Sequence, residues 1–265
     1  MYKIVILLLI AIALSTGTSA TVYNDRVYKA DIVATSAAHV ISGEFKIESP
    51  AGEGIAGMTL IVLSALPESR YADVGVYAKT DENGKASLSF SAYHPFVVKG
   101  TKAPDYQDMY IFGRTGSTDF QYTSFMGTRT ETQAMAALSA DIPAYDANTG
   151  YVIVGMDFLQ DPDNGLEPSN LVPAVGATAR VAGFATPYGG FIFDPTISFS
   201  TTLTNRSSSF VTYPNVQVGV KGHAEAFNAS DRSEGCLISP GFNQQVPPQY
   251  IEAFPDSVTV VCFLC

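Results

Sequence analysis

Short runs of alternating or continuous apolar residues, separated by turn residues, recur along the chain from Val40 onward. Alternation of apolar and polar positions is typical of a strand with one buried face, and a short continuous apolar run is typical of a strand buried on both faces. Pro50-Ala51-Gly52 and Asp81-Glu82-Asn83-Gly84 have the residues that tight turns require. The pattern predicts strands at Val40–Ile47, Thr59–Leu63, Tyr71–Lys79, Ala86–Phe90 and Phe96–Gly100.

The strand pattern restarts after Asn148-Thr149-Gly150. The order of segments then parallels that of the first half, which predicts two diverged copies of one β unit. The expected matches are Gly150–Val154 with Gly43–Ile47, Val175–Val181 with Ala56–Val62, Ser209–Val216 with Leu88–Phe90, and Val218–His223 with Phe96–Thr101. We therefore expect a first β-sandwich domain at residues 21–125, a connection at 126–147 and a second β-sandwich domain at 148–265.

One segment of the connection has a helical pattern instead. Thr130-Glu131-Thr132-Gln133 has the spacing of a capping box, and the residues of Ala134–Leu138 are good helix formers. Pro143 would end such a helix. The sequence predicts a short helix at Thr130–Ala140.

Two motifs carry a resemblance to a known family. Gly54–Val62 (GIAGMTLIV) followed by Thr80–Phe90 (TDENGKASLSF) is similar to the carboxypeptidase regulatory-like domain, a transthyretin-like β-sandwich that occurs in exported bacterial proteins. Val175–Val181 and Phe210–Val220 resemble the same module more loosely, because Ser207-Ser208-Ser209 stands where its Thr-Asp-x-x-Gly turn would be. The resemblance implies roughly seven strands per domain and a non-catalytic role. The expected fold is all-β, with two tandem immunoglobulin/transthyretin-like β-sandwich domains and a short connecting helix.

Residues 1–20 have the features of a leader for export. Lys3 precedes the apolar run Ile4–Leu14, and small residues end at Ala20, so a signal peptidase would cut before Thr21. The run is shorter than the roughly 20 residues that span a bilayer. We expect a signal peptide and a secreted protein, periplasmic or extracellular; the alternative is an uncleaved leader that anchors the chain.

The charge of the chain narrows the class of partners. Removal of the leader removes only Lys3, so 14 basic and 25 acidic residues leave a net charge of −11. An acidic surface repels phosphate backbones, which argues against a nucleic-acid partner. We expect the partner to be an envelope or extracellular protein or a glycan.

Three cysteines lie near the C-terminus, and an oxidising compartment favours a disulfide between two of them. We expect the pair Cys236–Cys262, which would tie a loop to the last strand. Cys236–Cys265 is the alternative, and Cys262–Cys265 would need a strained short loop. The remaining cysteine is either free or pairs between chains.

A cluster of acidic residues is the candidate metal site. Asp157, Asp161 and Asp163 supply the hard oxygen ligands that calcium prefers, and Gly165 follows them as in a binding loop. The pattern lacks the distal Glu of an EF-hand, so an acidic surface turn is the alternative. Calcium is the one cofactor that the sequence suggests.

The other candidate motifs have simpler interpretations. Gly52–Gly57 matches G-x-G-x-x-G, but a β-rich stretch follows it and not a helix, so we interpret its glycines as a turn. The three histidines, His39, His94 and His223, lack zinc-binding spacing. Six aromatic residues between Asp105 and Phe125 could stack on sugars, but packing between strands explains them more simply.

These observations predict an exported, non-enzymatic binding or structural module that acts at the cell envelope or outside the cell. Loops at a sandwich end or an exposed edge strand would bind the partner. Two alternatives remain: a carbohydrate-binding module that uses the aromatics between Asp105 and Phe125, or a hydrolase whose site is assembled around His94 or His223.

Overall fold

The computed structural model describes residues 39–49, 51–65, 71–135, 143–159, 171–174, 177–184, 188–189, 210–227, 235–238 and 249–265. His39–Cys265 forms a single compact body. The predicted leader at residues 1–20 lies outside the described residues. Within the described ranges, no helix is long and apolar enough to cross a membrane.

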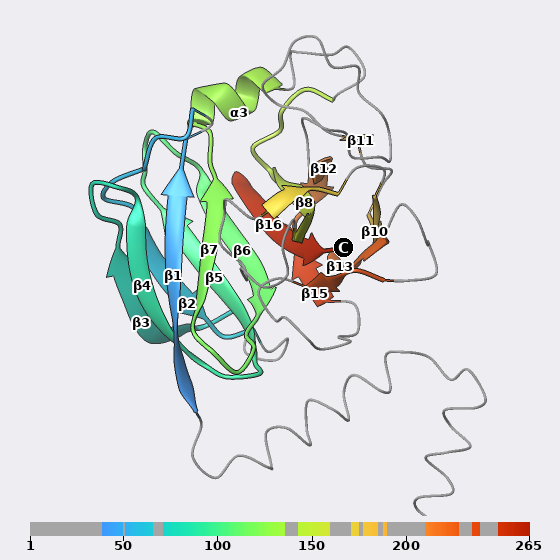
Figure 1. Ribbon diagram of the computed structural model, residues 1–265. Coiled ribbons are helices and arrows are strands. Elements are labelled where there is room, and N and C mark those ends of the chain that lie inside the picture. The colour runs from blue at the N-terminus through green and yellow to red at the C-terminus, as the bar shows by residue number, and fades with distance from the viewer. Residues whose placement is uncertain are drawn as a thin grey trace, which may run out of the picture. The chain divides into compact units, whose positions relative to one another are not determined.

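Among the residues that the structure describes, the fold is all-β apart from one short helix, as predicted. Seven strands build the first unit, which we define as β1–β7 (Figure 1). They form a sheet of order β4-β1-β7 that packs on strands of order β3-β2-β5-β6. Their bounds are β1 Val40–Glu48, β2 Thr59–Leu63, β3 Asp73–Lys79, β4 Lys85–Ser91, β5 Pro95–Thr101, β6 Asp108–Arg114 and β7 Phe120–Phe125.

The second unit, β8–β16, repeats this arrangement. One of its sheets has the order β10-β13-β15, and the other contains the order β12-β8-β16. The bounds are β8 Thr149–Leu159, β9 Leu171–Pro173, β10 Thr178–Ala182, β11 Tyr188–Gly189, β12 Phe210–Gln217, β13 Lys221–Phe227, β14 Leu237–Ile238, β15 Gln249–Glu252 and β16 Ser257–Leu264.

Strand pairing supports the predicted repeat. Six strands of the second unit, β8, β10, β12, β13, β15 and β16, correspond in order to β1, β2, β4, β5, β6 and β7. The strand β1 pairs antiparallel with β4 and parallel with β7, and β8 pairs in the same way with β12 and β16. The strand β5 pairs antiparallel with β2 and β6, and β13 pairs in the same way with β10 and β15. We call β6 and β15 the sixth strands of their units, and β7 and β16 the seventh, after their places in the first unit.

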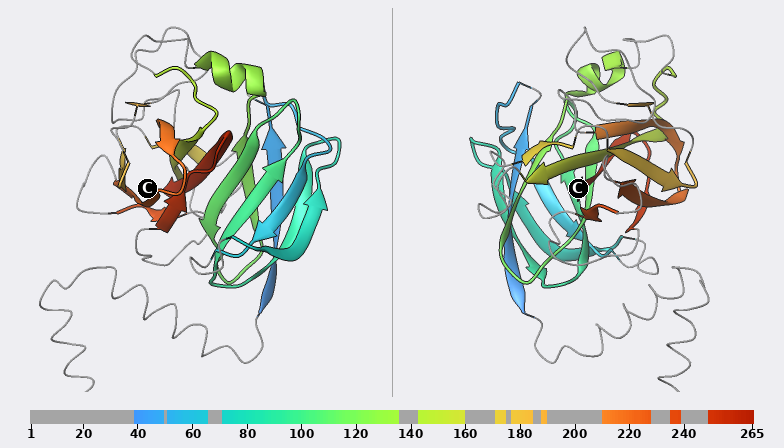
Figure 2. Two further views of the ribbon diagram at one scale, coloured as in Figure 1. Left: turned by 180° about the vertical axis from the view of Figure 1, so that it is seen from behind. Right: turned by 45° about the vertical axis from the view of Figure 1, so that its right-hand side comes forward.

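The two units share one sheet, because β16 lies between β6 and β8 and runs parallel to both (Figure 2). Ser257 is opposite Asp108 on one side and Gly150 on the other. The resulting order is β11-β12-β8-β16-β6-β5-β2-β3. The domain limits at 21–125 and 148–265 stay a prediction. Strands that the prediction assigns to different domains are neighbours in this one sheet.

Two hydrophobic cores lie on opposite faces of the shared sheet. Along β16, Val258, Val260 and Cys262 pack into the first core, and Val261, Phe263 and Cys265 into the second. The first core also contains Tyr151 of β8, and the second contains Tyr110 and Phe112 of β6. Each core therefore depends on side chains from both units.

The helix α3 spans Arg129–Met135 and begins one residue before the prediction. Its capping box is Thr128 and Glu131, and not the predicted Thr130 and Gln133. Thr128 Oγ1 accepts a hydrogen bond from Glu131 N (3.2 Å), and Glu131 Oε2 accepts one from Thr128 N (2.7 Å). Residues 136–142, which include the rest of the predicted helix, lie outside the described residues.

Two predicted turns pack against each other in the first unit. Gly54 pairs with Glu48, and a Cβ added at Gly54 would lie 2.2 Å from the carbonyl carbon of Asn83. Asp81 Oδ1 accepts hydrogen bonds from Asn83 N (2.8 Å) and Lys85 N (2.9 Å), which closes the second turn. The G-x-G-x-x-G segment is thus a turn in which a glycine allows two backbones to approach.

Candidate functional site

A polar cluster lies where three parallel strands begin, at the amino ends of β6, β8 and β16. We define the Asp256 cluster as Gln107, Arg129, Tyr145 and Asp256. Gln107 directly precedes β6, Arg129 opens α3, and Asp256 lies in the turn between β15 and β16. The cluster therefore joins segments from both units and from the connection between them.

The carboxylate of Asp256 is the acceptor at the centre of the cluster. Arg129 Nη1 donates to Oδ2, and the Tyr145 hydroxyl donates to Oδ1. Gln107 Nε2 also donates to Oδ1, at 3.0 Å, and donates to the Tyr145 oxygen. A carboxylate oxygen cannot donate a hydrogen bond, so the amide nitrogen of Gln107 must face Asp256.

The backbone holds Asp256 in this position. Its φ of 49° lies in the left-handed region, which Asp tolerates better than most residues. Asp256 N donates to Thr149 O (2.9 Å), at the start of β8. Arg129 N donates to Asp105 O (2.8 Å), just before β6. Asp256 is thus attached to β8, and Arg129 to the turn that leads into β6.

The cluster keeps Asp256 ionised. Burial alone would raise the pKa of the Asp256 carboxyl, but hydrogen bonds from Arg129, Tyr145 and Gln107 together outweigh it, so the net pKa lies below 3.8. Burial, and then the hydrogen bond to Asp256, raise the pKa of Tyr145. A carboxylate with three donors around it is a poor general base, because accepting a proton would break these bonds. The arrangement favours a structural brace across the joint between the units.

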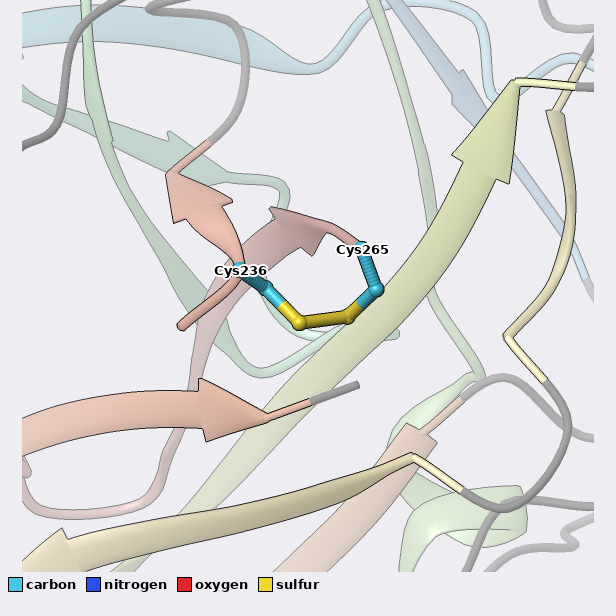
Figure 3. Close-up of a disulfide and its surroundings, with 2 residues drawn as sticks. All are labelled: Cys236 and Cys265. Carbon is cyan, nitrogen blue, oxygen red and sulfur yellow. A yellow bond between two sulfur atoms is a disulfide. The ribbon is translucent and has the colours of Figure 1, made fainter. Parts of the chain in front are cut away.

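The disulfide corrects the predicted pairing. The structure bonds Cys236 to Cys265, with an S–S distance of 2.02 Å (Figure 3). Cys262 is a free cysteine. The predicted pair Cys236–Cys262 is wrong because side chains three residues apart on a strand point to opposite faces. Cys236 and Cys265 both pack against the second core, whereas Cys262 packs against the first.

Cys262 is placed for packing and not for reactivity. Its sulfur accepts a hydrogen bond from the Tyr122 hydroxyl (3.2 Å), and a Cβ added at Gly155 would lie 2.9 Å from it. Burial raises the pKa of the Cys262 thiol to about 12, although the bond from Tyr122 lowers it. A thiol that stays protonated at neutral pH is a weak nucleophile.

The calcium prediction falls largely outside the described residues. Asp157 lies half-buried on β8, but Asp161 and Asp163 belong to the range 160–170, which the structure does not describe. Asp157 O accepts a hydrogen bond from Cys265 N (2.7 Å). In the described part of the chain, no group of three His, Cys, Asp or Glu residues could hold a metal ion. The calcium site therefore stays a prediction.

The histidines occupy separate places in the fold. His39 O accepts from Ala92 N (2.8 Å), and His94 N donates to Thr115 Oγ1 (2.8 Å) in the first unit. His223 lies on β13 in the second unit, where its ring meets Tyr250 at 3.7 Å. Burial lowers the pKa of His223.

Most of the aromatics between Asp105 and Phe125 are part of the cores. Tyr122 contacts Phe45 in the first core at 5.6 Å, and Phe112 contacts Tyr71 at 5.8 Å at the second core. Phe125, with 58% of its surface exposed, is the one large aromatic of this segment that faces solvent. Packing accounts for the others.

Comparison with known proteins gives only distant matches. No protein-family model and no curated protein matches the chain. Among solved structures, the chain is similar to the Bacillus anthracis TIE protein at 13% identity and a TM-score of 0.25, covering 85% of this chain and 34% of that one. It is similar to a streptococcal ancillary pilin at 13% identity and a TM-score of 0.27, covering 87% of this chain and 63% of that one. It is also similar to shaft pilin SpaA from Lactobacillus rhamnosus GG at 7% identity and a TM-score of 0.24, covering 85% of this chain and 97% of that one. The chain thus spans less than two thirds of the first two of these proteins, and TM-scores this low assign neither a family nor a function.

Proposed function

We propose that this chain is an exported structural β-sandwich module, non-enzymatic, that acts at the cell envelope or outside the cell and binds a protein or a glycan there. The observation that carries the proposal is the shared sheet. Because β16 is paired on both sides and packed on both faces, the two units cannot move apart without breaking backbone hydrogen bonds and exposing apolar side chains.

The titratable groups at the joint support the same role. Asp256 and Arg129 hold the turn before β16 to the start of α3, and Tyr145 links both to the segment before β8. These side chains are used in fixing the fold. A module that transmits load or presents a surface needs this kind of rigidity between its units.

The disulfide supports export. A bond between Cys236 and the last residue, Cys265, persists in oxidising compartments and is rare in the cytosol. It adds to the leader-like pattern of residues 1–20, in which Ala20 precedes the expected cut.

The test is a crosslinking pull-down with the chain expressed in its native host, from the envelope fraction and from the culture medium. We expect a product that starts at Thr21 by intact mass, contains one disulfide, and co-purifies with one partner in stoichiometric amount. Recovery of the chain only in the cytosol with reduced cysteines would refute the proposal. Turnover by the purified protein on a panel of hydrolase substrates would refute its non-enzymatic part.

A further inference from the structure

The joint between the two units is an asymmetric contact between repeats. The sixth strand of the first unit, β6, pairs in parallel with the seventh strand of the second unit, β16, over Asp108–Phe112 and Ser257–Val261. One unit uses its sixth strand and the other its seventh, so the contact is heterologous. A heterologous contact does not use up both complementary surfaces, and repeating it gives an open chain of units.

The joint uses the sixth strand of the first unit and the seventh strand of the second. The sixth strand of the second unit and the seventh strand of the first have no part in it, and each lies at the edge of a sheet. The sixth strand of the second unit, β15, ends the sheet β10-β13-β15, and the seventh strand of the first unit, β7, ends the sheet β4-β1-β7. Among the strands that the structure describes, β15 pairs only with β13, and β7 pairs only with β1.

We propose that β15 of one molecule pairs in parallel with β7 of a second copy, so that copies of this chain assemble head to tail. The combined sheet would have the order β10-β13-β15-β7-β1-β4. This order corresponds strand for strand to β2-β5-β6-β16-β8-β12, which exists within the chain. The inference rests on the proposed structural function and names a second copy as the partner.

The composition of β7 supports this use of its edge. Exposed edge strands are usually protected by charges, bulges or proline, because an open row of peptide groups attracts other strands. The edge strand β3 has such protection: Asp73 and Lys79 lie at its ends, Gly75 has a φ of 81°, and its pairing with β2 is irregular. The sequence of β7, FQYTSF, has no charge, no proline and no glycine, and it presents Phe125 to solvent.

Comparison of the proposed contact with the joint between β6 and β16 predicts that the contact between molecules is weaker than the joint within the chain. The strand β15 has four residues, whereas the internal joint pairs five residues of each strand. Thr123 of β7 is half-buried and polar, whereas Val258 and Val260 of β16 supply apolar side chains to a core. We therefore expect a reversible assembly that grows with protein concentration.

The experiment is sedimentation velocity on the purified full chain over a range of concentrations, with three variants. Phe125→Lys places a charge on the β7 edge, and Tyr250→Lys places one on the β15 edge. Val74→Lys is the matched control, because Val74 is a comparably exposed apolar residue (51%) on the protected edge of β3. All four proteins should have the same circular dichroism, since each replaced side chain is at least partly exposed.

We expect the unmodified chain and Val74→Lys to form a ladder of species, and each of the other variants to associate at least about tenfold more weakly. An equimolar mixture of Phe125→Lys and Tyr250→Lys should form dimers and no larger species, because one intact β15 edge meets one intact β7 edge. A monomer at all concentrations, a closed dimer, or equal loss in Val74→Lys would overturn the inference. A monomer that still recovers an envelope partner in the pull-down would overturn this inference alone and leave the structural function standing.

Discussion

Replacement of Phe112 by alanine tests whether the two units form one cooperative structure. Phe112 belongs to β6 of the first unit, is 1% exposed, and packs into the second core, where its ring contacts Tyr71 at 5.8 Å. Loss of a buried phenylalanine side chain destabilises a core by about 3–5 kcal/mol. If His39–Cys265 unfolds as one cooperative structure, the midpoint of thermal unfolding should fall by about 6–20 °C.

The assay is thermal unfolding by circular dichroism, together with hydrogen exchange of peptides from each unit. We expect a single transition, with β12 and β13 of the second unit losing protection at the same temperature as β1 and β4 of the first. Phe45→Ala, in the first core, is the matched core variant and should lower the same transition. Phe125→Ala, at an exposed site, should change it by less than about 0.5 kcal/mol. Two separate transitions, with Phe112→Ala shifting only the one that belongs to the first unit, would show that the shared sheet does not couple the units.

Four further variants test other features. Asp256→Ala should destabilise the fold by about 1–3 kcal/mol, because it removes the acceptor of three side-chain hydrogen bonds, one of them from the buried amide of Gln107. The folded-state pKa of Asp256 is lowered, so its contribution to stability is complete above the unfolded-state pKa of 3.8 and is lost as the pH falls through the lower folded-state pKa; in urea unfolding, the difference in stability between Asp256→Ala and the unmodified chain should narrow as the pH falls below 3.8. Cys236→Ser should lower stability by about 3.6 kcal/mol on the chain-entropy estimate for a separation of 29 residues, and a reducing agent should lower the melting midpoint of the unmodified chain but not of this variant. Cys262→Ser should keep the disulfide, as intact mass under non-reducing conditions would show; loss of the bond would contradict the pairing. Gly54→Ala should cost about 1–3 kcal/mol in chemical denaturation, because its methyl group would meet the backbone of the neighbouring turn.

Strand positions in the first unit could be predicted because the information is local. The apolar pattern predicted Thr59–Leu63 at the bounds that the structure has, and the other four predicted strands within two residues of theirs. The strands β6 and β7 were not predicted individually. In the second unit, Val218–Val220 was expected to be part of a strand but lies in the turn before Lys221. Gly219 there has a φ of 79°, a conformation that turns require and strands do not.

The shared sheet could not be predicted, because pairing between distant strands leaves little trace in either of them. One signal was present: Val258–Leu264 is apolar almost throughout, as expected for a strand buried on both faces, whereas strands with one solvent face alternate. The pairing of Cys236 with Cys265 and not with Cys262 also depends on contacts between distant segments. The position of the second core decides which face of β16 lies against Cys236, and the local sequence does not contain that information.

The central place of β16 has a consequence for biosynthesis. The strand that both cores need, β16, is made of residues 257–264 and follows every other described strand in sequence. Neither core is complete without it, so β1–β7 cannot close their core from their own side chains alone. We therefore expect the two units to become stable together during folding, and not one after the other in the order of synthesis.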